Sequence, residues 1–241
     1  MTTEPTRRPL ALVTGGTRGI GRAICEVLAP THDLLVGGRD EAAVAEAVAA
    51  LSTKGCTAHP FVAELSDDAQ TAAAVDHAAE VLDGRLDVLV HSAGIARSGT
   101  VEELTREDWR VQLEVNVVAV ADLTRRLLPA LREARGQVVV INSGSGFLSR
   151  AGGGSYSASK FAVRALTDAL REEERGQVRV CSIHPGRVDT DMQVDLQRSK
   201  GRAYDPDEHL RADSVAATVR LAVDASPEAM VEELSIRPVH P

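Results

Sequence analysis

The amino-acid sequence predicts one doubly wound α/β domain, whose mostly parallel sheet of seven strands carries helices on both faces. Two observations predict it: short apolar runs alternate with longer periodic segments, and aromatic residues make up only 2% of the chain. A core built from Ala, Val and Leu suits strands that helices cover on both sides. The expected strands are Leu10–Val13, Leu34–Gly37, Ala58–Val62, Leu86–His91, Gln137–Asn142, Val178–His184 and Glu233–Ile236.

A plausible helix follows each of the first six runs, and local residues mark where several of these helices begin. Asp40 and Ser66 are expected N-caps, and Thr105 with Asp108 resembles a capping box. Pro129 is expected to bend or shorten its helix. The expected helices include Ile20–Leu28, Asp40–Thr53, Ser66–Leu82, Thr105–Glu133 and Tyr156–Arg175.

The length of 241 residues suits a single α/β unit, and no Ser/Pro-rich linker divides it. We therefore expect one domain over residues 1–241. Residues 1–9 are expected to be flexible. The least regular stretch, residues 190–213, lies before a final helix, where a mobile substrate lid is expected.

Composition excludes several classes of partner. The net charge is −8, and no Lys/Arg run is longer than two residues, which argues against nucleic acid. No apolar run approaches the ~20 residues that cross a membrane. Cys25, Cys56 and Cys181 are odd in number and never spaced as CxxC, so neither a disulfide framework nor a metal site is expected. A reducing, cytoplasmic location fits best.

A glycine-rich loop, Val13–Gly21, follows the first strand and opens the first helix. Glycines at 15, 19 and 21 permit a tight turn and a close approach of backbone to phosphate, and the helix N-terminus favours anions. An ordinary βα turn is the competing interpretation. The strand–turn–helix context favours a dinucleotide site.

Tyr156 and Lys160 stand four residues apart in an expected helix, so they share one face. Only three of the 27 basic residues are lysines, which suggests a requirement that arginine cannot meet. An ammonium beside a phenol lowers the pKa of that phenol. An exposed helix pair is the alternative interpretation.

Two polar residues strengthen the catalytic interpretation. Ser143 lies at the carboxyl end of an expected strand, the edge where open α/β sheets bind ligands. Asn116 lies within an apolar helical segment, where its amide must find partners. It is either a satisfied core residue or part of a buried relay.

Together these residues resemble the short-chain dehydrogenase/reductase family over roughly residues 10–238. Thr14–Gly21 matches the family's TGxxxGxG loop, Tyr156–Lys160 its YxASK motif, and Pro185–Thr190 its PGxVxT segment. The resemblance implies a Rossmann fold that acts as one dinucleotide-binding oxidoreductase domain. It also implies a homodimer or homotetramer.

The resemblance further implies catalytic roles. Tyr156 would be the general acid in reduction and the base in oxidation. Lys160 would lower the phenol's pKa and bind the nicotinamide ribose. Ser143 would hold the carbonyl oxygen, and Asn116 would anchor a water of the relay. Such donors suit the alkoxide that develops as hydride arrives.

The expected cofactor site follows from the same resemblance. It comprises the glycine loop, the ends of the second, third and fourth strands, the Tyr–Lys pair and the PGxVxT segment. Its residues are Gly15, Thr17, Arg18, Gly19, Ile20, Gly21, Gly38, Arg39, Glu64, Leu65, Ala93, Gly94, Tyr156, Lys160, Pro185, Gly186, Val188 and Thr190.

Two positions depart from the family pattern. His91-Ser92-Ala93-Gly94 replaces Asn-Asn-Ala-Gly, and Glu64 stands where the family often has Asp at the adenine. In the family that asparagine helps to hold the central sheet together, and Ser92 could do part of this; Glu64 is one methylene longer than the usual Asp. His91 is expected in the core or a loop, since nothing near it has ligand spacing.

The second strand ends in Gly38-Arg39, where NAD-binding members carry an acid that takes the ribose 2′-OH. Arg39 and Arg18 can clamp a 2′-phosphate, although both could instead be solvated surface residues. NADP(H) is therefore expected in preference to NAD(H).

The expected function is an NADP(H)-dependent oxidoreductase acting on a small carbonyl or alcohol. A 3-oxoacyl-thioester reductase and a non-catalytic NADP(H)-binding regulator are the alternatives. The negative net charge gives little support to an acidic carrier as partner. Residues expected near a partly apolar substrate are Arg97, Phe147, Leu148, Met192 and Tyr204.

Overall fold

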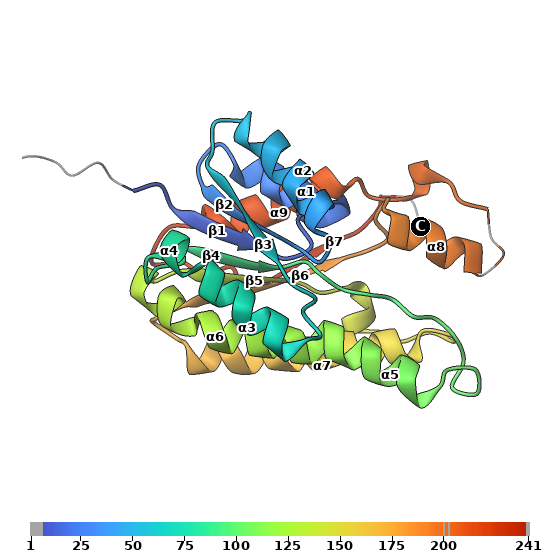
Figure 1. The fold of residues 1–241 in the computed structure, drawn as a ribbon. Coiled ribbons are helices and arrows are strands. Elements are labelled where there is room, and N and C mark those ends of the chain that lie inside the picture. Colours follow the sequence, from blue (N-terminus) through green and yellow to red (C-terminus); the bar gives the residue numbers. More distant parts are fainter. Residues whose placement is uncertain (1–6, 200, 202, 240–241) are drawn as a thin grey trace, which may run out of the picture.

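The computed structural model describes residues 7–199, 201 and 203–239. Its sheet has seven strands in the order β3-β2-β1-β4-β5-β6-β7 (Figure 1). All pairings of these strands are parallel, so the expected fold class is confirmed. The strands are β1 (Leu10–Val13), β2 (Asp33–Gly38), β3 (Ala58–Val62), β4 (Val88–His91), β5 (Gln137–Ile141), β6 (Arg179–Pro185) and β7 (Glu233–Ile236).

Helices cover both faces of this sheet. On one face α1, α2 and α9 pack over a core of small and aliphatic side chains, and on the other α3, α6 and α7 cover a second such core (Figure 1). The α-helices are α1 (Gly19–Leu28), α2 (Glu41–Ser52), α3 (Asp68–His77), α4 (Ala79–Leu82), α5 (Arg106–Leu113), α6 (Ala119–Ala134), α7 (Gly154–Glu173), α8 (Asp191–Ser199) and α9 (Ala212–Val223). A π-helical turn, η1 (Glu114–Val118), and two 3-10 turns, η2 (Gly144–Gly146) and η3 (Pro206–Glu208), complete the elements.

Capping residues explain where helices begin. Asp40 accepts a hydrogen bond from the Ala43 amide, and Thr105 forms a full capping box with Asp108, as expected. The expectation for Ser66 was wrong. Asp67 caps α3 instead, because the Ser66 hydroxyl donates to a Glu64 carboxylate oxygen at 2.9 Å.

Two expected helices are divided. The segment expected over 66–82 splits into α3 and α4 at Ala78, and the segment over 105–133 contains the π-helical turn η1 around Asn116. Pro129 does not end its helix, since α6 continues to Ala134. A π turn is a single-turn feature inside an α-helix, and the expected helix over 105–133 did not include one.

The order of the strands places a crevice above the carboxyl ends of β1 and β4. Strands β2 and β3 lie on one side of β1, and strands β4 to β7 lie on its other side. The strand order therefore reverses between β1 and β4, which is the switch point of the sheet. The loops leaving the strands meet there: the Thr14 amide donates to the Val90 carbonyl and the Gly16 amide to the Gly37 carbonyl.

The segment expected as a lid, residues 190–213, contains α8 and η3 and is tied at its base. Val188 pairs with Leu210 in an isolated bridge, and the Tyr204 hydroxyl donates to the Asp189 carboxylate. Of the N-terminal residues 1–9, the first six lie outside the described part. Arg7 donates to the Val81 carbonyl of α4, and Arg8 donates to the Ala29 carbonyl just after α1. No helix among the described residues is long and apolar enough to span a bilayer.

Candidate active site

Ser143 and Tyr156 meet at the carboxyl edge of the sheet. Ser143 follows β5 and its Oγ accepts a hydrogen bond from the Ser145 amide at 3.1 Å, which starts the turn η2. Tyr156 lies in the first turn of α7. Burial raises the pKa of Tyr156, while a hydrogen bond with the Ser143 side chain acts in the opposite direction. The phenol is therefore protonated over the whole neutral range.

Lys160 lies one turn further along α7 and is only 7% exposed. Its Nζ donates to the Ile141 carbonyl at 3.0 Å and lies 5.8 Å from the centre of the Tyr156 ring. Burial lowers the pKa of Lys160 to about 8. The pKa of Tyr156 is raised overall, contrary to the expectation for a phenol beside an ammonium, because burial dominates.

Asn116 is 2% exposed and its side-chain amide is engaged by protein groups. Its Oδ1 accepts from the Ile95 amide, and its Nδ2 donates to the Ile95 carbonyl and to the Ser159 hydroxyl, at 2.9, 2.9 and 3.0 Å. It thus joins the loop after β4 to the helix that carries Tyr156.

The sequence analysis did not predict a role for Gln112. This residue lies one helical turn before Asn116 and also binds the loop after β4. Gln112 is fully buried. Its Nε2 donates to the Ile95 carbonyl at 2.7 Å, and its Oε1 accepts from the Arg97 amide at 2.8 Å. A second amide four residues before Asn116 was the available signal, since both lie on one helical face.

The glycines of this loop let the protein backbone approach a ligand closely, without side chains in between. Gly15 and Gly19 have positive φ angles of 66° and 54°. A Cβ on Gly21 would lie 2.1 Å from the Gly15 carbonyl oxygen. Among the described contacts, Arg18 makes no side-chain capping bond at the start of α1. The first amides of α1 are therefore available to an anion, which fits the phosphates of a dinucleotide.

A cleft of about 500 Å³ opens over this loop. Most of the expected cofactor residues line it: Gly15, Thr17, Arg18, Gly19, Ile20, Gly21, Gly38, Arg39, Glu64, Leu65, Ala93, Gly94 and Thr190. Five other expected cofactor residues do not line this cleft: Tyr156, Lys160, Pro185, Gly186 and Val188. Lining residues that were absent from the expected set are Thr14, Gly37, Phe61, Ala63, Ser92, Ile95, Val115, Asp189, Asp191, Met192 and Val194.

Thr14 holds the two halves of this cleft together. Its hydroxyl oxygen accepts from the Ser92 amide at 3.0 Å and from the Ala93 amide at 3.1 Å, and its side chain is 1% exposed. The hydroxyl therefore connects the end of β1 with the loop after β4. This contact spans the region of the sheet in which the sequence lacks the family's usual asparagine.

The end of β2 has no space for an acidic side chain. A Cβ on Gly38 would lie 2.7 Å from Val44 Cγ2 and 2.9 Å from Thr17 Cγ2. Two guanidinium groups border the cleft instead, and each is ion-paired: Arg39 with Glu64 at 3.3 Å and Arg18 with Asp191 at 2.9 Å. Both arginines are mostly exposed, so these pairs are weak and exchangeable.

The residues expected near the substrate are dispersed. Met192 lines the cleft. The Phe147 ring packs instead against the His184 ring, at 4.4 Å between centres, and beneath the Arg164 guanidinium. Arg97 pairs with Asp108, and Tyr204 is held by Asp189. Leu148 is 60% exposed. Among the described residues of this set, only Met192 lines the cleft, and the approach of all five to a substrate stays a prediction.

His91 belongs to the core. It is 3% exposed, its Nε2 lies 2.8 Å from the Thr124 hydroxyl, and burial lowers its pKa to about 3. Within residues 7–199, 201 and 203–239, no three His, Cys, Asp or Glu side chains gather as a metal site would require.

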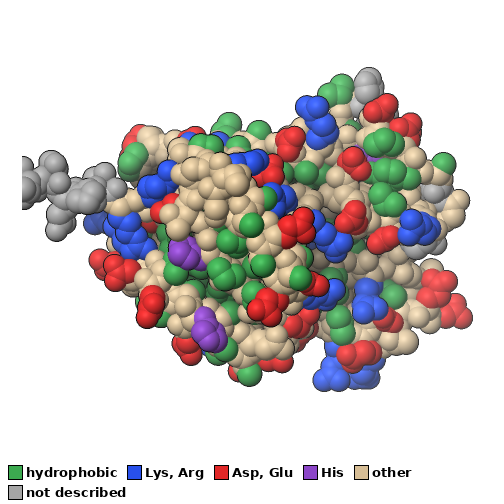
Figure 2. Space-filling model, turned by 45° about the horizontal axis from the view of Figure 1, so that its top comes forward, with side chains coloured by type: hydrophobic (Ala, Val, Ile, Leu, Met, Phe, Trp, Pro, Cys, Tyr) green, Lys and Arg blue, Asp and Glu red, His purple; other side chains and the backbone are tan. Residues whose placement is uncertain are grey.

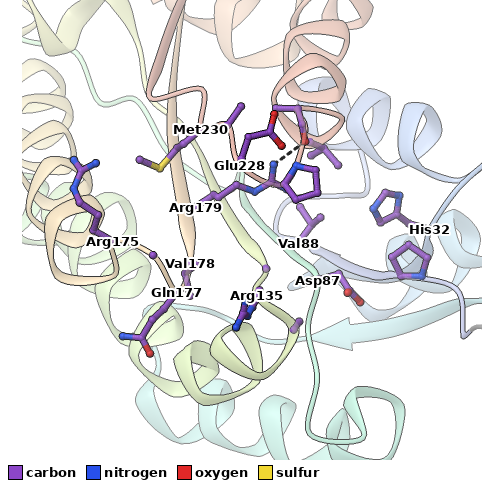
Figure 3. Close-up of a pocket in the computed structure, with 18 residues that line it drawn as sticks. His32, Asp87, Val88, Arg135, Arg175, Gln177, Val178, Arg179, Glu228 and Met230 are labelled. Atoms are coloured by element: carbon purple, nitrogen blue, oxygen red, sulfur yellow. Dashed lines mark hydrogen bonds between the residues drawn. The ribbon is translucent and has the colours of Figure 1, made fainter.

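A second hollow, of about 650 Å³, lies at the opposite, amino edge of the sheet (Figure 3). Three of its charged side chains have protein partners: Arg179 donates to the Ala225 carbonyl, Asp87 accepts from the Leu10 amide, and Glu228 accepts from the Ser226 hydroxyl. None of the catalytic candidates borders it. On the face seen in Figure 2, acidic and basic side chains are interspersed.

Comparisons with known proteins agree with this geometry. The family model for short chain dehydrogenase matches residues 9–201. Dehydrogenase/reductase SDR family member 7B of Mus musculus is 36% identical over 207 residues, which cover 82% of this chain and 63% of that protein. The chain thus spans less than two thirds of the mouse protein.

Two further matches cover a larger share of the matched proteins. The 3-oxoacyl-(acyl-carrier-protein) reductase of Pseudomonas aeruginosa is 31% identical over 197 residues, covering 80% of this chain and 79% of that protein. The structure of an alcohol dehydrogenase from Thermococcus sibiricus complexed with 5-hydroxy-NADP superposes with a TM-score of 0.89 at 28% identity, over 98% of both chains.

Proposed function

Since the chain belongs to the short-chain dehydrogenase family, we propose that it is an NADP(H)-dependent oxidoreductase that transfers a hydride between the nicotinamide and a carbonyl or alcohol. One observation carries the proposal. Ser143, Tyr156 and Lys160 come together at the carboxyl edge of the sheet, the edge at which the glycine-rich loop lines the cleft.

In this proposal the bound cofactor supplies the hydride and the protein supplies the proton. The Tyr156 phenol is protonated at neutral pH because burial raises its pKa, so it suits a general acid in carbonyl reduction. The Ser143 hydroxyl donates to the substrate oxygen and stabilises the charge that develops there. In alcohol oxidation the same phenol oxygen takes the proton back.

Lys160 would bind the nicotinamide ribose and, with Asn116, would connect the phenol to solvent. Its pKa of about 8 keeps most of the ammonium charged at neutral pH. Because the Asn116 side chain is occupied by Ile95 and Ser159, a relay water would contact its main chain. The π-helical turn around Asn116 supports this role, since such turns free a carbonyl from the helix.

NADP(H) is proposed in preference to NAD(H). Arg18 and Arg39 border the cleft, and the packing at Gly38 excludes the carboxylate that would favour NAD. A 2′-phosphate would replace the carboxylates of Asp191 and Glu64 as the partner of these guanidinium groups. The NADP analogue bound in the similar T. sibiricus structure supports this preference.

One alternative substrate class has specific support. The P. aeruginosa relative acts on 3-oxoacyl groups carried by a protein, so a 3-oxoacyl-thioester reductase is the second candidate. A regulator that binds NADP(H) without turnover is less well supported, because such a protein does not require the Ser143–Tyr156–Lys160 set.

We further propose one catalytic domain over residues 1–241, a cytoplasmic location and a homo-oligomer. The buried, unpaired state of Cys25, Cys56 and Cys181 supports a reducing compartment. Val118 and Phe161, which are exposed on neighbouring helical segments, support burial of that face against a second copy.

The test is NADPH consumption with a panel of ketones, aldehydes, quinones and 3-oxoacyl thioesters. Turnover of at least one carbonyl substrate, with NADPH preferred over NADH, is expected. Saturable NADPH binding without turnover of any substrate would favour the regulator, and reduction confined to thioesters would favour the second candidate.

A further inference from the structure

His184 is a fully buried histidine that takes no part in the chemistry proposed above. It is the penultimate residue of β6 and is 0% exposed. Its ring lies against the loop that begins at Ser143 and against the last strand, β7. Buried polar side chains need partners on both ring nitrogens, and the partners of His184 are specific.

The Nδ1 atom of His184 lies 3.2 Å from the Ser143 carbonyl oxygen. A carbonyl oxygen only accepts, so Nδ1 must carry the hydrogen. The same carbonyl accepts from the Gly146 amide at 2.9 Å. Two donors thus fix the peptide that follows Ser143, while the Ser145 amide holds the Ser143 hydroxyl oxygen from the other side at 3.1 Å.

The contacts of the other ring nitrogen, Nε2, fit a ring that carries its hydrogen on Nδ1. Nε2 lies 2.9 Å from the Ser182 hydroxyl and 3.4 Å from a Glu233 carboxylate oxygen. A neutral ring with hydrogen on Nδ1 accepts at Nε2 from Ser182. Burial is the largest effect and lowers the pKa of His184, so the neutral form is favoured, although the Ser143 carbonyl and the Glu233 carboxylate favour a protonated ring.

Neighbouring side chains hold the ring in place. Phe147, four residues after Ser143, packs on it at 4.4 Å between ring centres, and Arg164 lies over the other side of Phe147. The Arg237 guanidinium, just after β7, donates to the His184 carbonyl. The histidine is therefore clamped between the serine loop and the end of β7.

We propose that His184 is a positioning residue for Ser143, whose Nδ1–H orients the Ser143 peptide and so aims the serine hydroxyl at Tyr156. The inference rests on the proposed function only through the role of Ser143. The link also makes β7 part of the support of the active site, although β7 contributes no catalytic group. Small displacements of a catalytic group reduce turnover strongly, which is why this hydrogen bond matters.

Two variants separate the hydrogen bond from the packing. His184→Phe keeps a ring but has no donor, whereas His184→Asn places an amide N–H where Nδ1 stood and loses the ring. We expect kcat to fall about tenfold or more in His184→Phe and to stay near the wild-type value in His184→Asn, with the KM for NADPH unchanged in both. His32→Phe, at the opposite edge of the sheet, is the matched control for a buried histidine.

If kcat instead followed ring packing, falling in His184→Asn and not in His184→Phe, the proposal would be wrong. A second measurement needs neither turnover nor a variant at the catalytic serine. Nitrogen chemical shifts of the wild-type imidazole, assigned by loss of the signal in His184→Asn, should report a neutral ring with hydrogen on Nδ1. Hydrogen on Nε2 would overturn the proposal even if the enzyme assays agreed with it.

A third readout separates this proposal from the proposed function. In a Tyr204→Phe background, Tyr156 is the only tyrosine. Its phenol titration should move to higher pH in His184→Phe, because the Ser143 hydrogen bond lowers the pKa of Tyr156, and should stay in place in His184→Asn. A titration that is unchanged in both variants would contradict the positioning role, whether or not any carbonyl is reduced.

Discussion

The Nζ atom of Lys160 donates a hydrogen bond to the carbonyl of Ile141, the last residue of β5, at 3.0 Å. This single acceptor does not replace the hydration of an ammonium, and burial lowers the pKa of Lys160 from 10.5 to about 8. We therefore expect the buried lysine to reduce the stability of the fold, a cost that its proposed role in the active site would explain.

Lys160→Met should therefore stabilise the protein while abolishing its activity. The wild-type folded state binds the lysine proton less tightly than the unfolded chain does. At neutral pH both states are protonated and the full penalty is present, at most about 3 kcal/mol at ~1.4 kcal/mol per pKa unit. Between pH 8 and 10.5 the folded protein releases the proton first, so wild-type stability rises relative to the variant.

Urea unfolding of wild type and Lys160→Met across this pH range is the measurement. The stability gain should be largest near pH 7 and shrink toward pH 10.5. Lys54→Met, at a side chain that is 46% exposed, is the control for removing a lysine that is not buried, and it should not stabilise the protein at pH 7. A variant less stable than wild type at pH 7 would contradict the burial argument.

Tyr156→Phe should lower kcat by at least ~10²-fold, the lower range for general acid catalysis. NADPH affinity should change little, since only a hydroxyl is removed. Stopped-flow binding and steady-state turnover check the two parts separately. Tyr204→Phe, at the other tyrosine, should keep most of kcat because its hydroxyl bonds to Asp189. Near-wild-type turnover of Tyr156→Phe would refute the assignment of the acid.

Removing both cleft arginines, as Arg18→Ala with Arg39→Ala, should act on one cofactor only. Charge-assisted hydrogen bonds contribute about 1.5–3 kcal/mol each, reduced here because Asp191 and Glu64 must be displaced. We expect kcat/KM for NADPH to fall more than ~10-fold and that for NADH to change little.

These two arginines are a better test of cofactor choice than Gly38, where any side chain would collide with Val44. Arg125→Ala, on α6 and paired with Asp122, is the matched control. An equal loss with both cofactors, or a wild type that already prefers NADH, would mean that Arg18 and Arg39 do not bind a 2′-phosphate.

Thr14→Val should destabilise the protein without changing the shape of the side chain. It leaves the Ser92 and Ala93 amides without their acceptor, at a cost of about 2 kcal/mol. For a chain of this size that lowers Tm by roughly 4–8 °C. Calorimetry with and without NADPH is the measurement, and Thr53→Val on the exposed end of α2 is the control. An unchanged Tm would show that these amides find other partners.

Local signals in the sequence predicted most of the fold. Alternating apolar runs located all seven strands within two residues of their ends, since burial on both faces selects for such runs. The caps at Asp40 and Thr105 were readable because their bonds join residues three apart. Ser66 misled because its hydroxyl bonds to Glu64, which a cap pattern does not encode.

Contacts of the candidate site that join distant segments of the chain were harder to predict from the sequence. The glycine loop and the Tyr–Lys pair are local patterns. The bonds from Gln112 and Asn116 to Ile95 cross 17 and 21 residues, and that from His184 to Ser143 crosses 41. The contacts of Phe147 with His184 and Arg164 likewise join distant segments, so its sequence neighbours do not reveal them.

Gly21 admits no side chain, because a Cβ there would meet the Gly15 carbonyl oxygen at 2.1 Å, so this part of the loop presents only backbone. Its backbone can therefore distinguish nothing beyond the phosphates that all dinucleotides share. In the proposed function, discrimination between one dinucleotide and another would rest with the exposed side chains of Arg18 and Arg39. Cofactor preference could then change, in evolution or by design, through surface substitutions that leave the hydrophobic core and the glycine-rich loop unchanged.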